Sequence, residues 1–213
     1  MIVAAHQTML APPALPYDAE VEYLESTGTQ YVDTGIVPTG ATGIDCDFAL
    51  LNPTQNFSPV FWSRGSSATD RAFCFEGEKV SGDTKGQARW DYGNYGTLQV
   101  RNIIEQGVRT TVSVRSGTLT VAGSTLSRAA QTFTGAGSVI LFNFCNYVNG
   151  QRQMIAATVR PIRIYSCAIY DGSTLVRSYV PVRSGSVGYL YDRVSGQLFG
   201  NAGTGAFAIG PDK

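Results

Sequence analysis

Apolar and polar residues alternate with a period of two along much of this 213-residue chain, and this alternation constrains the fold more than any other feature. It is clearest in residues 108–126, where four β-branched residues at alternate positions precede a Ser-Gly turn and a returning alternating segment. Such a pattern predicts a β-hairpin with one buried face. No segment keeps the 3.6-residue period of an amphipathic helix beyond a turn or two. The chain is therefore predicted to be all-β, as a two-sheet antiparallel sandwich.

The composition agrees with this prediction. Charged residues make up only 15% of the chain, against about 25% in an average soluble protein. The 24 glycines and the frequent β-branched and aromatic residues are typical of strands joined by turns. The length suits one domain with a sizeable core. That core is predicted to include Val60, Phe73, Phe75, Val112, Val139, Leu141, Phe142 or Phe144, Ile164, Ile169 and Val180.

Charge and cysteine usage exclude several kinds of function. The net charge is +0 and no basic block occurs, so binding to nucleic acid is not expected. No run approaches the roughly 20 apolar residues of a membrane span, so membrane insertion is not expected either. The four cysteines lack a CxxC spacing and the only histidine is His6, so we expect buried free thiols and no zinc site, with two disulfides in an oxidising compartment as the alternative. No metal and no cofactor are predicted, and the alternative is a calcium ion at a loop rim that carries Asp70, Asp83 or Asp91. The cysteines are Cys46, Cys74, Cys145 and Cys167.

Residues 1–16 differ from the rest of the chain and are predicted to form an extended N-terminal arm. Three prolines in this segment disfavour a helix or a central strand. The domain proper is predicted to span residues 17–213. An extended segment has no core of its own, so we expect its apolar side chains to anchor the protein to a neighbour. These anchor residues are Ile2, Val3, Met9 and Leu10.

Three segments carry a resemblance to a known family. Residues 20–39 (EVEYLESTGTQYVDTGIVPT), 162–183 (IRIYSCAIYDGSTLVRSYVPVR) and 188–207 (GYLYDRVSGQLFGNAGTGAF) resemble the two ends of the concanavalin A-like, laminin G-like jelly-roll domains found in gut bacteria and their phages. The resemblance implies a jelly-roll sandwich in which the last strands lie beside the first. The family includes glycan binders, virion parts and enzymes, so the resemblance does not assign a function.

Enzymatic activity is not expected. Glycoside hydrolysis needs two carboxylates on either side of the scissile bond, and the glucanases of this superfamily carry them in an E-x-D-x-x-E run. This chain has instead three pairs of carboxylates at alternate positions, which any solvated strand face can show. No histidine of the domain is available for a Ser–His or Cys–His site. The pairs are Glu20 with Glu22, Asp45 with Asp47, and Glu76 with Glu78.

Two segments have the composition of a glycan site, in which aromatic rings face a sugar and polar side chains reach its hydroxyls. Both are predicted to be loops, which often carry function, although aromatic residues in a sandwich also fill the core. A third candidate, Trp62, has apolar neighbours that favour core packing. The first segment, residues 87–96, supplies Arg89, Trp90, Asp91, Tyr92, Asn94 and Tyr95. The second, residues 146–153, supplies Asn146, Tyr147, Asn149 and Arg152.

Two functions follow from these features. In the first, the protein is a non-catalytic phage virion accessory (a decoration, head-fibre or tail component) located on the virion surface. Its arm would contact other virion proteins or copies of itself, and its lectin-like domain would bind host-surface glycans. In the alternative, it is a free-standing or cell-surface bacterial lectin-like protein, located outside the cell. A glycoside hydrolase is the weaker third alternative. The absence of a signal-peptide pattern favours release by lysis over secretion.

Overall fold

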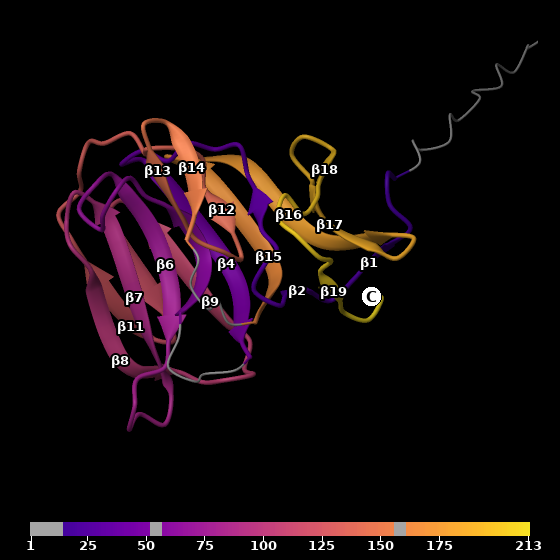
Figure 1. Cartoon of the computed structure of the whole chain (residues 1–213), viewed down its shortest axis with the longest axis horizontal. Coiled ribbons are helices and arrows are strands. Elements are labelled where there is room, and N and C mark those ends of the chain that lie inside the picture. Colours follow the sequence, from indigo (N-terminus) through magenta and orange to yellow (C-terminus); the bar gives the residue numbers. More distant parts are fainter. Residues whose placement is uncertain (1–14, 52–56, 156–160) are drawn as a thin grey trace, which may run out of the picture.

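The computed structural model describes residues 15–51, 57–155 and 161–213. These residues form strands, turns and loops and contain no helix. Accordingly, no part of the described chain is a helix able to cross a membrane. The strands form two antiparallel sheets and a separate hairpin, and Figure 1 shows the sheets as packed layers with one end of the larger sheet extending past the smaller one. The predicted all-β, antiparallel jelly-roll sandwich is confirmed for the described residues.

The larger sheet has eleven strands. Strand β2 (Leu24–Ser26) pairs with the first residues of β15 (Ile162–Asp171), and β16 (Thr174–Ser184) pairs with the later residues of β15. Strand β1 (Ala19–Glu20) pairs with β16, and β19 (Ala208–Ile209) pairs with β2. In order across the sheet the main strands are β11 (Ser124–Ser127), β10 (Thr118–Val121), β9 (Thr110–Arg115), β4 (Thr42–Leu50), β15 (Ile162–Asp171), β16 (Thr174–Ser184), β17 (Val187–Asp192) and β18 (Gln197–Phe199). The three added strands are β1 (Ala19–Glu20), β2 (Leu24–Ser26) and β19 (Ala208–Ile209). The predicted hairpin in residues 108–126 is β9 and β10.

The smaller sheet has six strands, and a two-stranded hairpin stands apart from it in the pairing. In order the six strands are β3 (Val32–Asp33), β12 (Ile140–Leu141), β5 (Phe57–Ser63), β6 (Ala72–Glu78), β7 (Gly86–Gly93) and β8 (Leu98–Ile104). The hairpin consists of β13 (Cys145–Val148) and β14 (Gln151–Met154).

The core lies between the two sheets and is rich in aromatic rings. Phe48 of β4 packs edge-on against Phe75 of β6, with 5.6 Å between ring centroids, and Phe75 stacks on Phe61 of β5 at 5.8 Å. All the core residues predicted from the sequence are buried, and the most exposed of them, Val180, is only 8% accessible. Four cysteines are also buried and free, in agreement with the sequence-based prediction. The core therefore forms without a disulfide among these residues.

The two ends of the domain lie side by side, as the family resemblance implies. Strand β19 pairs with β2, and Val21 forms a bridge with Asp212. Figure 1 shows the C-terminus beside β1 and β19, at the end of the larger sheet that extends beyond the smaller one. The closing segment of the chain thus completes the larger sheet.

Two buried polar residues explain the motifs that carry the resemblance. The amide of Gln30 accepts a hydrogen bond from Thr27 N (2.9 Å) and donates one to Ala206 O (3.0 Å), so it joins the first turn to the closing segment. The carboxylate of Asp192 accepts hydrogen bonds from Ser178 N and the Ser195 hydroxyl, both at 2.7 Å. Burial acts to raise the pKa of Asp192, but these hydrogen bonds hold it below its ordinary value. Both motifs serve the fold.

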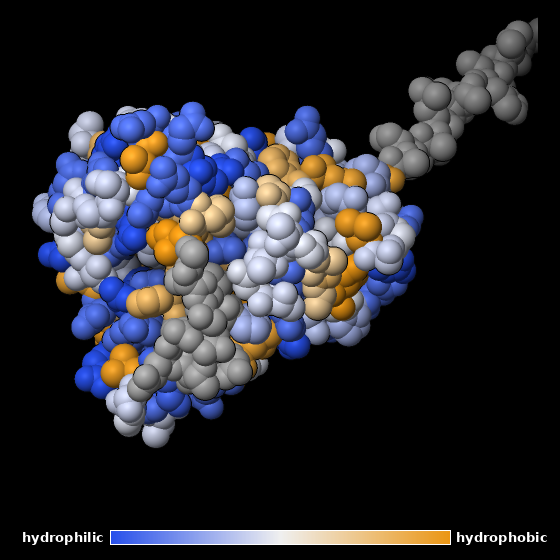
Figure 2. Space-filling view, in the orientation of Figure 1, coloured by the Kyte–Doolittle hydropathy of each residue, from blue (hydrophilic) through white to orange (hydrophobic). Residues whose placement is uncertain are grey.

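The anchor residues Ile2, Val3, Met9 and Leu10 lie outside the described residues. The extended arm, the domain boundary at residue 17 and the anchoring role all stay predictions. The exposed apolar side chains in the described part are scattered along the chain, and on the face shown in Figure 2 the apolar residues form small groups within a mostly hydrophilic surface.

Candidate functional site

The candidate site lies on the face of the smaller sheet that points away from the core. Successive side chains of a strand point to opposite faces, and β7 follows this rule. Trp90 and Tyr92 are in the core, whereas Arg89 and Asp91 point to the opposite face and line a pocket. Glu76 reaches the same pocket from β6, where it is the register partner of Arg89. The sheet thus fixes three charged side chains on a rigid surface.

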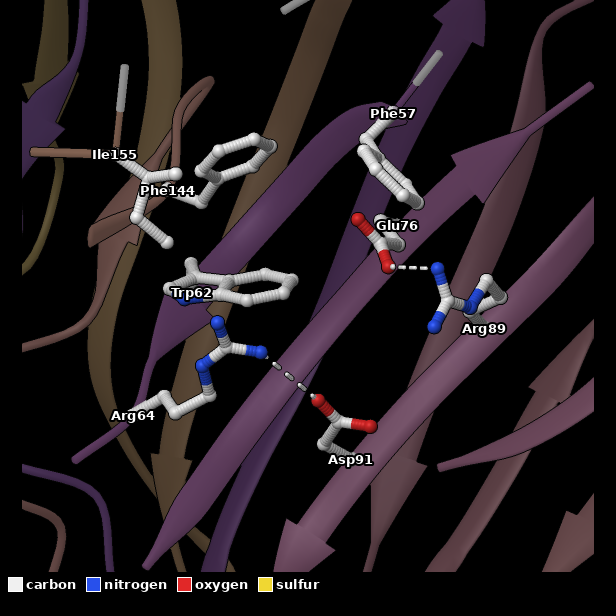
Figure 3. A pocket seen from close by; sticks show the side chains of 8 residues that line it. All are labelled: Phe57, Trp62, Arg64, Glu76, Arg89, Asp91, Phe144 and Ile155. Atoms are coloured by element: carbon white, nitrogen blue, oxygen red, sulfur yellow. Dashed lines mark ion pairs between the residues drawn. The ribbon is translucent and has the colours of Figure 1, made fainter. Parts of the chain in front are cut away.

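The pocket has a volume of about 180 Å³. Pockets that enclose drug-sized ligands measure roughly 300–1,000 Å³, so this one suits a group of about one ring. Charged and aromatic side chains share its lining, as Figure 3 shows. The lining residues are Phe57, Trp62, Arg64, Glu76, Arg89, Asp91, Phe144 and Ile155.

Two arginines lie against aromatic rings at opposite sides of the pocket. The guanidinium carbon of Arg64 is 4.8 Å from the centroid of Trp62, and that of Arg89 is 5.2 Å from the centroid of Phe57. Stacking of this kind restricts the plane of the guanidinium and so orients its N–H groups.

Each arginine also has a carboxylate partner. A nitrogen of Arg64 is 3.8 Å from an Asp91 oxygen, and Nη1 of Arg89 is 3.2 Å from Glu76 Oε1. Figure 3 shows the second oxygen of Glu76 directed away from Arg89, toward the space between Phe57 and Trp62. The pocket therefore contains hydrogen-bond donors and acceptors beside apolar ring surfaces.

The hairpin β13–β14 is held to the sheet beside this pocket. The indole N–H of Trp62 donates to the carbonyl of Cys145 at 2.9 Å, and Arg64 Nε donates to the Asn146 side-chain oxygen at 3.0 Å. The hairpin thereby helps to position both Trp62 and Arg64.

A second set of contacts fastens the outer strand of the hairpin. Arg152 of β14 donates to the hydroxyl of Tyr147 at 2.9 Å and forms an ion pair with Asp33 of β3. Tyr147 in turn donates to the carbonyl of Ser138 at 2.9 Å. These contacts fix the hairpin on the outer face of the smaller sheet.

Burial sets the protonation of the two carboxyl groups. Burial raises the pKa of Glu76 to about 8. The positive charge of Arg89 lowers this pKa, and the negative charges of Asp91 and Glu78 raise it further. Burial also raises the pKa of Asp91, while Thr97, Arg64 and Arg89 oppose the rise. Carboxyl groups with raised pKa values often mark functional sites. At neutral pH, Glu76 is therefore mainly a neutral acid.

The outer face of β7 has hydrogen-bonding capacity that its neighbours leave unused. Gln87 Oε1 and Arg89 Nε are buried and have no hydrogen-bond partner among the described residues. Native proteins pair most buried polar atoms, and unpaired ones call for a physical explanation. A polar ligand or bound water at this face would supply such partners.

Predictions for residues 87–96 require a correction. The segment was predicted to be a loop, but most of it is strand β7. Trp90 and Tyr92 each expose only 1% of their surface, so neither ring is available to stack on a sugar. Asn94 and Tyr95 follow the strand and do not line the pocket: Asn94 N donates to Gln131, and Arg128 lies over the ring of Tyr95.

Residues 146–153 also form strands, β13 and β14, joined by a turn. Asn146 orients Arg64, and Tyr147 and Arg152 hold the hairpin. Asn149 occupies the turn with a φ of 51° and is exposed, away from the lining residues. The structure therefore brings Arg89, Asp91 and Asn146 together and separates the other predicted residues from the pocket.

Several lining residues were missed by the sequence-based prediction. Phe57, Arg64, Phe144 and Ile155 come from four separate stretches, and only the fold brings them together. For Trp62, the sequence predicts packing in the core. Its exposure is 4%, but it packs in a second apolar cluster under the hairpin and borders the pocket.

Comparison with known proteins gives no family. No protein-family model matches the chain, and no curated protein matches it. Among solved structures, the CBM40 of the Ruminococcus gnavus IT-sialidase bound to α2,3-sialyllactose has a TM-score of 0.41 at 14% identity, covering 68% of this chain and 89% of that one. The same CBM40 bound to α2,6-sialyllactose has a TM-score of 0.34 at 12% identity, with coverages of 70% and 88%. At these values the likeness assigns neither family nor ligand.

Proposed function

We propose that this protein is a non-catalytic glycan-binding protein, and that the pocket on the outer face of the smaller sheet receives one sugar ring of the glycan. The observation that carries this proposal is the convergence of two arginines, each stacked on an aromatic ring and paired with a carboxyl group, on one small pocket.

The chemistry of the pocket matches that of a sugar. A pyranose presents apolar C–H faces and a ring of hydroxyl groups that both donate and accept hydrogen bonds. Aromatic rings suit the first, and fixed guanidinium and carboxyl groups suit the second. The unpaired Gln87 Oε1 and Arg89 Nε add polar atoms at the same face. Because strands supply most of these groups, little ordering is needed when a ligand binds.

The same contacts disfavour hydrolysis. A neutral Glu76 has the protonation state of a general acid, but hydrolysis also needs a second, ionised carboxylate as nucleophile or base. Asp91, the other carboxyl group of the pocket, is paired with Arg64 and has a raised pKa, and both properties hinder that role. The other paired carboxylates lie on the larger sheet, where Asp45 and Asp47 form ion pairs with Arg115 and Arg109. A binding role therefore accounts for the geometry better than the hydrolase alternative does.

A glycan array tests the proposal, with α2,3- and α2,6-sialyllactose among its glycans. Binding to the best glycan is then measured by calorimetry, and the mixture is checked for hydrolysis products. Replacement of Arg64 by alanine should weaken binding about 10- to 100-fold, since a hydrogen bond to a charged group contributes roughly 1.5–3 kcal/mol. Absence of binding to every glycan would refute the proposal, and appearance of products would favour the hydrolase.

Arg109 offers a matched control for Arg64. It too stacks on an aromatic ring, Tyr165, at 4.7 Å, and pairs with a carboxylate, Asp47, but it directly precedes β9 of the larger sheet and does not line the pocket. Arg109→Ala should leave glycan binding unchanged. Equal losses in the two variants would show that the effect of Arg64→Ala is a general loss of stability.

Whether the protein binds glycans as a lectin-like protein outside the cell or as part of a phage virion is a separate question. A lectin-like protein outside the cell needs only the pocket, and so this alternative has the better support. The phage virion role depends on the family resemblance and on an arm that lies outside the described residues, and it stays a prediction.

A further inference from the structure

We propose that Glu76 is a specificity-determining residue of this site: it enters the pocket as a neutral carboxylic acid and donates a hydrogen bond from Oε2 to an acceptor oxygen of the bound sugar. This inference rests on the proposed glycan-binding function and adds to it the chemical role of one residue.

The two oxygens of Glu76 have different surroundings. Oε1 faces Nη1 of Arg89 at 3.2 Å, and a guanidinium can only donate. Oε1 is therefore the acceptor oxygen of the pair. Oε2 points toward the space between Phe57 and Trp62 (Figure 3). The proton of a neutral carboxyl group is best placed on Oε2, where it does not meet the N–H of Arg89.

The groups around Glu76 account for a retained proton. Only 5% of the residue is accessible, and burial disfavours the charged form. On β6, Glu78 adds a like charge, and from β7 Asp91 adds another, while Arg89 and Arg64 oppose them. The remaining titratable neighbour, Cys74, is a buried thiol whose pKa burial raises well above its ordinary value, so it adds no charge.

A neutral acid at this position changes what the pocket can recognise. An ionised carboxylate only accepts hydrogen bonds, whereas a neutral carboxyl group also donates one. With Glu76 neutral, the pocket presents donors from Arg64, Arg89 and Glu76 and an acceptor in Asp91. The favoured ligand is a sugar whose ring or hydroxyl oxygen accepts from Glu76 while a neighbouring hydroxyl donates to Asp91.

The test measures binding of a panel of methyl glycosides (glucoside, galactoside, mannoside and N-acetylglucosaminide) to the full chain across the pKa of about 8. If only the neutral form binds, the apparent Kd rises about tenfold for each pH unit above that value. Glu76→Gln keeps an N–H donor that does not titrate, so its affinity should not change through this pH range. Glu76→Ala should bind weakly at every pH.

Glu78→Gln is the matched control, because Glu78 is two residues along the same strand and also contacts Arg89 but does not line the pocket. It should keep the pH dependence, with a midpoint shifted slightly downward by the loss of a like charge. Binding by the wild type that does not change with pH would refute the role of Glu76 and leave the glycan-binding function standing. Absence of binding by every glycoside at low pH, together with a blank glycan array, would refute both.

Discussion

The buried carboxyl group of Glu76 makes the stability of the protein depend on pH in a way that one substitution should remove. The pKa of Glu76 is raised from 4.5 to about 8 in the folded protein. Between these two values the unfolded chain releases the proton while the folded protein retains it. The free energy of unfolding therefore falls as the pH rises through this range, by about 1.4 kcal/mol per unit. Below 4.5 both states are protonated, and above 8 both are ionised, so the loss stops.

Between pH values of about 5 and about 9, this one group should lower the free energy of unfolding by about 4 kcal/mol. In a protein of this length, that corresponds to a fall in Tm of roughly 8–16 °C. Glu76→Gln cannot ionise and should lack this part of the pH dependence. The variant should therefore gain stability relative to the wild type as the pH rises, whatever its effect at low pH.

Urea denaturation of both proteins at the two pH values measures this difference. The comparison between wild type and variant cancels the titration of all other groups, apart from those that interact directly with Glu76. Parallel pH profiles for the two proteins would refute the assignment of a neutral Glu76 in the folded state. They would also remove the basis for the donor role proposed for this residue.

Two further substitutions test the placement of single residues. Trp90→Ala should lower the free energy of unfolding by roughly 3–5 kcal/mol, since a buried aromatic ring leaves a cavity; a change of less than 1 kcal/mol in denaturant unfolding would contradict its burial. Asp192→Asn should cost roughly 1.5–3 kcal/mol because it weakens hydrogen bonds to a charged acceptor. The pKa of Asp192 is held below its ordinary value of 3.8, so the wild-type carboxylate stabilises the fold above that pH. This stabilisation is lost as the pH falls through the folded-state pKa. The difference in free energy of unfolding between wild type and variant should therefore become smaller at low pH.

The sequence was sufficient to predict the architecture and the core because both follow from local alternation. A period of two identifies strands and their buried faces, and each core residue named from this pattern is buried. The same pattern is present in residues 88–92, where Ala88, Trp90 and Tyr92 alternate with Arg89 and Asp91. The flanking glycines instead favour a loop whose aromatic rings face a ligand, and this prediction is wrong for Trp90 and Tyr92.

The pocket could be predicted only in part. Two of its charged residues, Arg89 and Asp91, were among the candidates. Their partners are Glu76 of β6 and Arg64, which directly follows β5, and the proximity of the four residues depends on how β5, β6 and β7 pair in register. Composition cannot reveal that register. The raised pKa of Glu76 likewise arises from burial, which is a property of the folded chain.

The pairing of the first and last strands has a consequence for how the protein folds. Val21 bridges Asp212, and β2 is flanked by β15 on one side and β19 on the other, so contacts join residues almost a full chain length apart. Such long-range pairings slow folding, because loop closure must precede the gain from contact. During synthesis, one edge of β2 stays open until β19 has been made and pairs with it. An open strand edge can pair with another chain, so this edge of β2 is exposed to aggregation until β19 covers it.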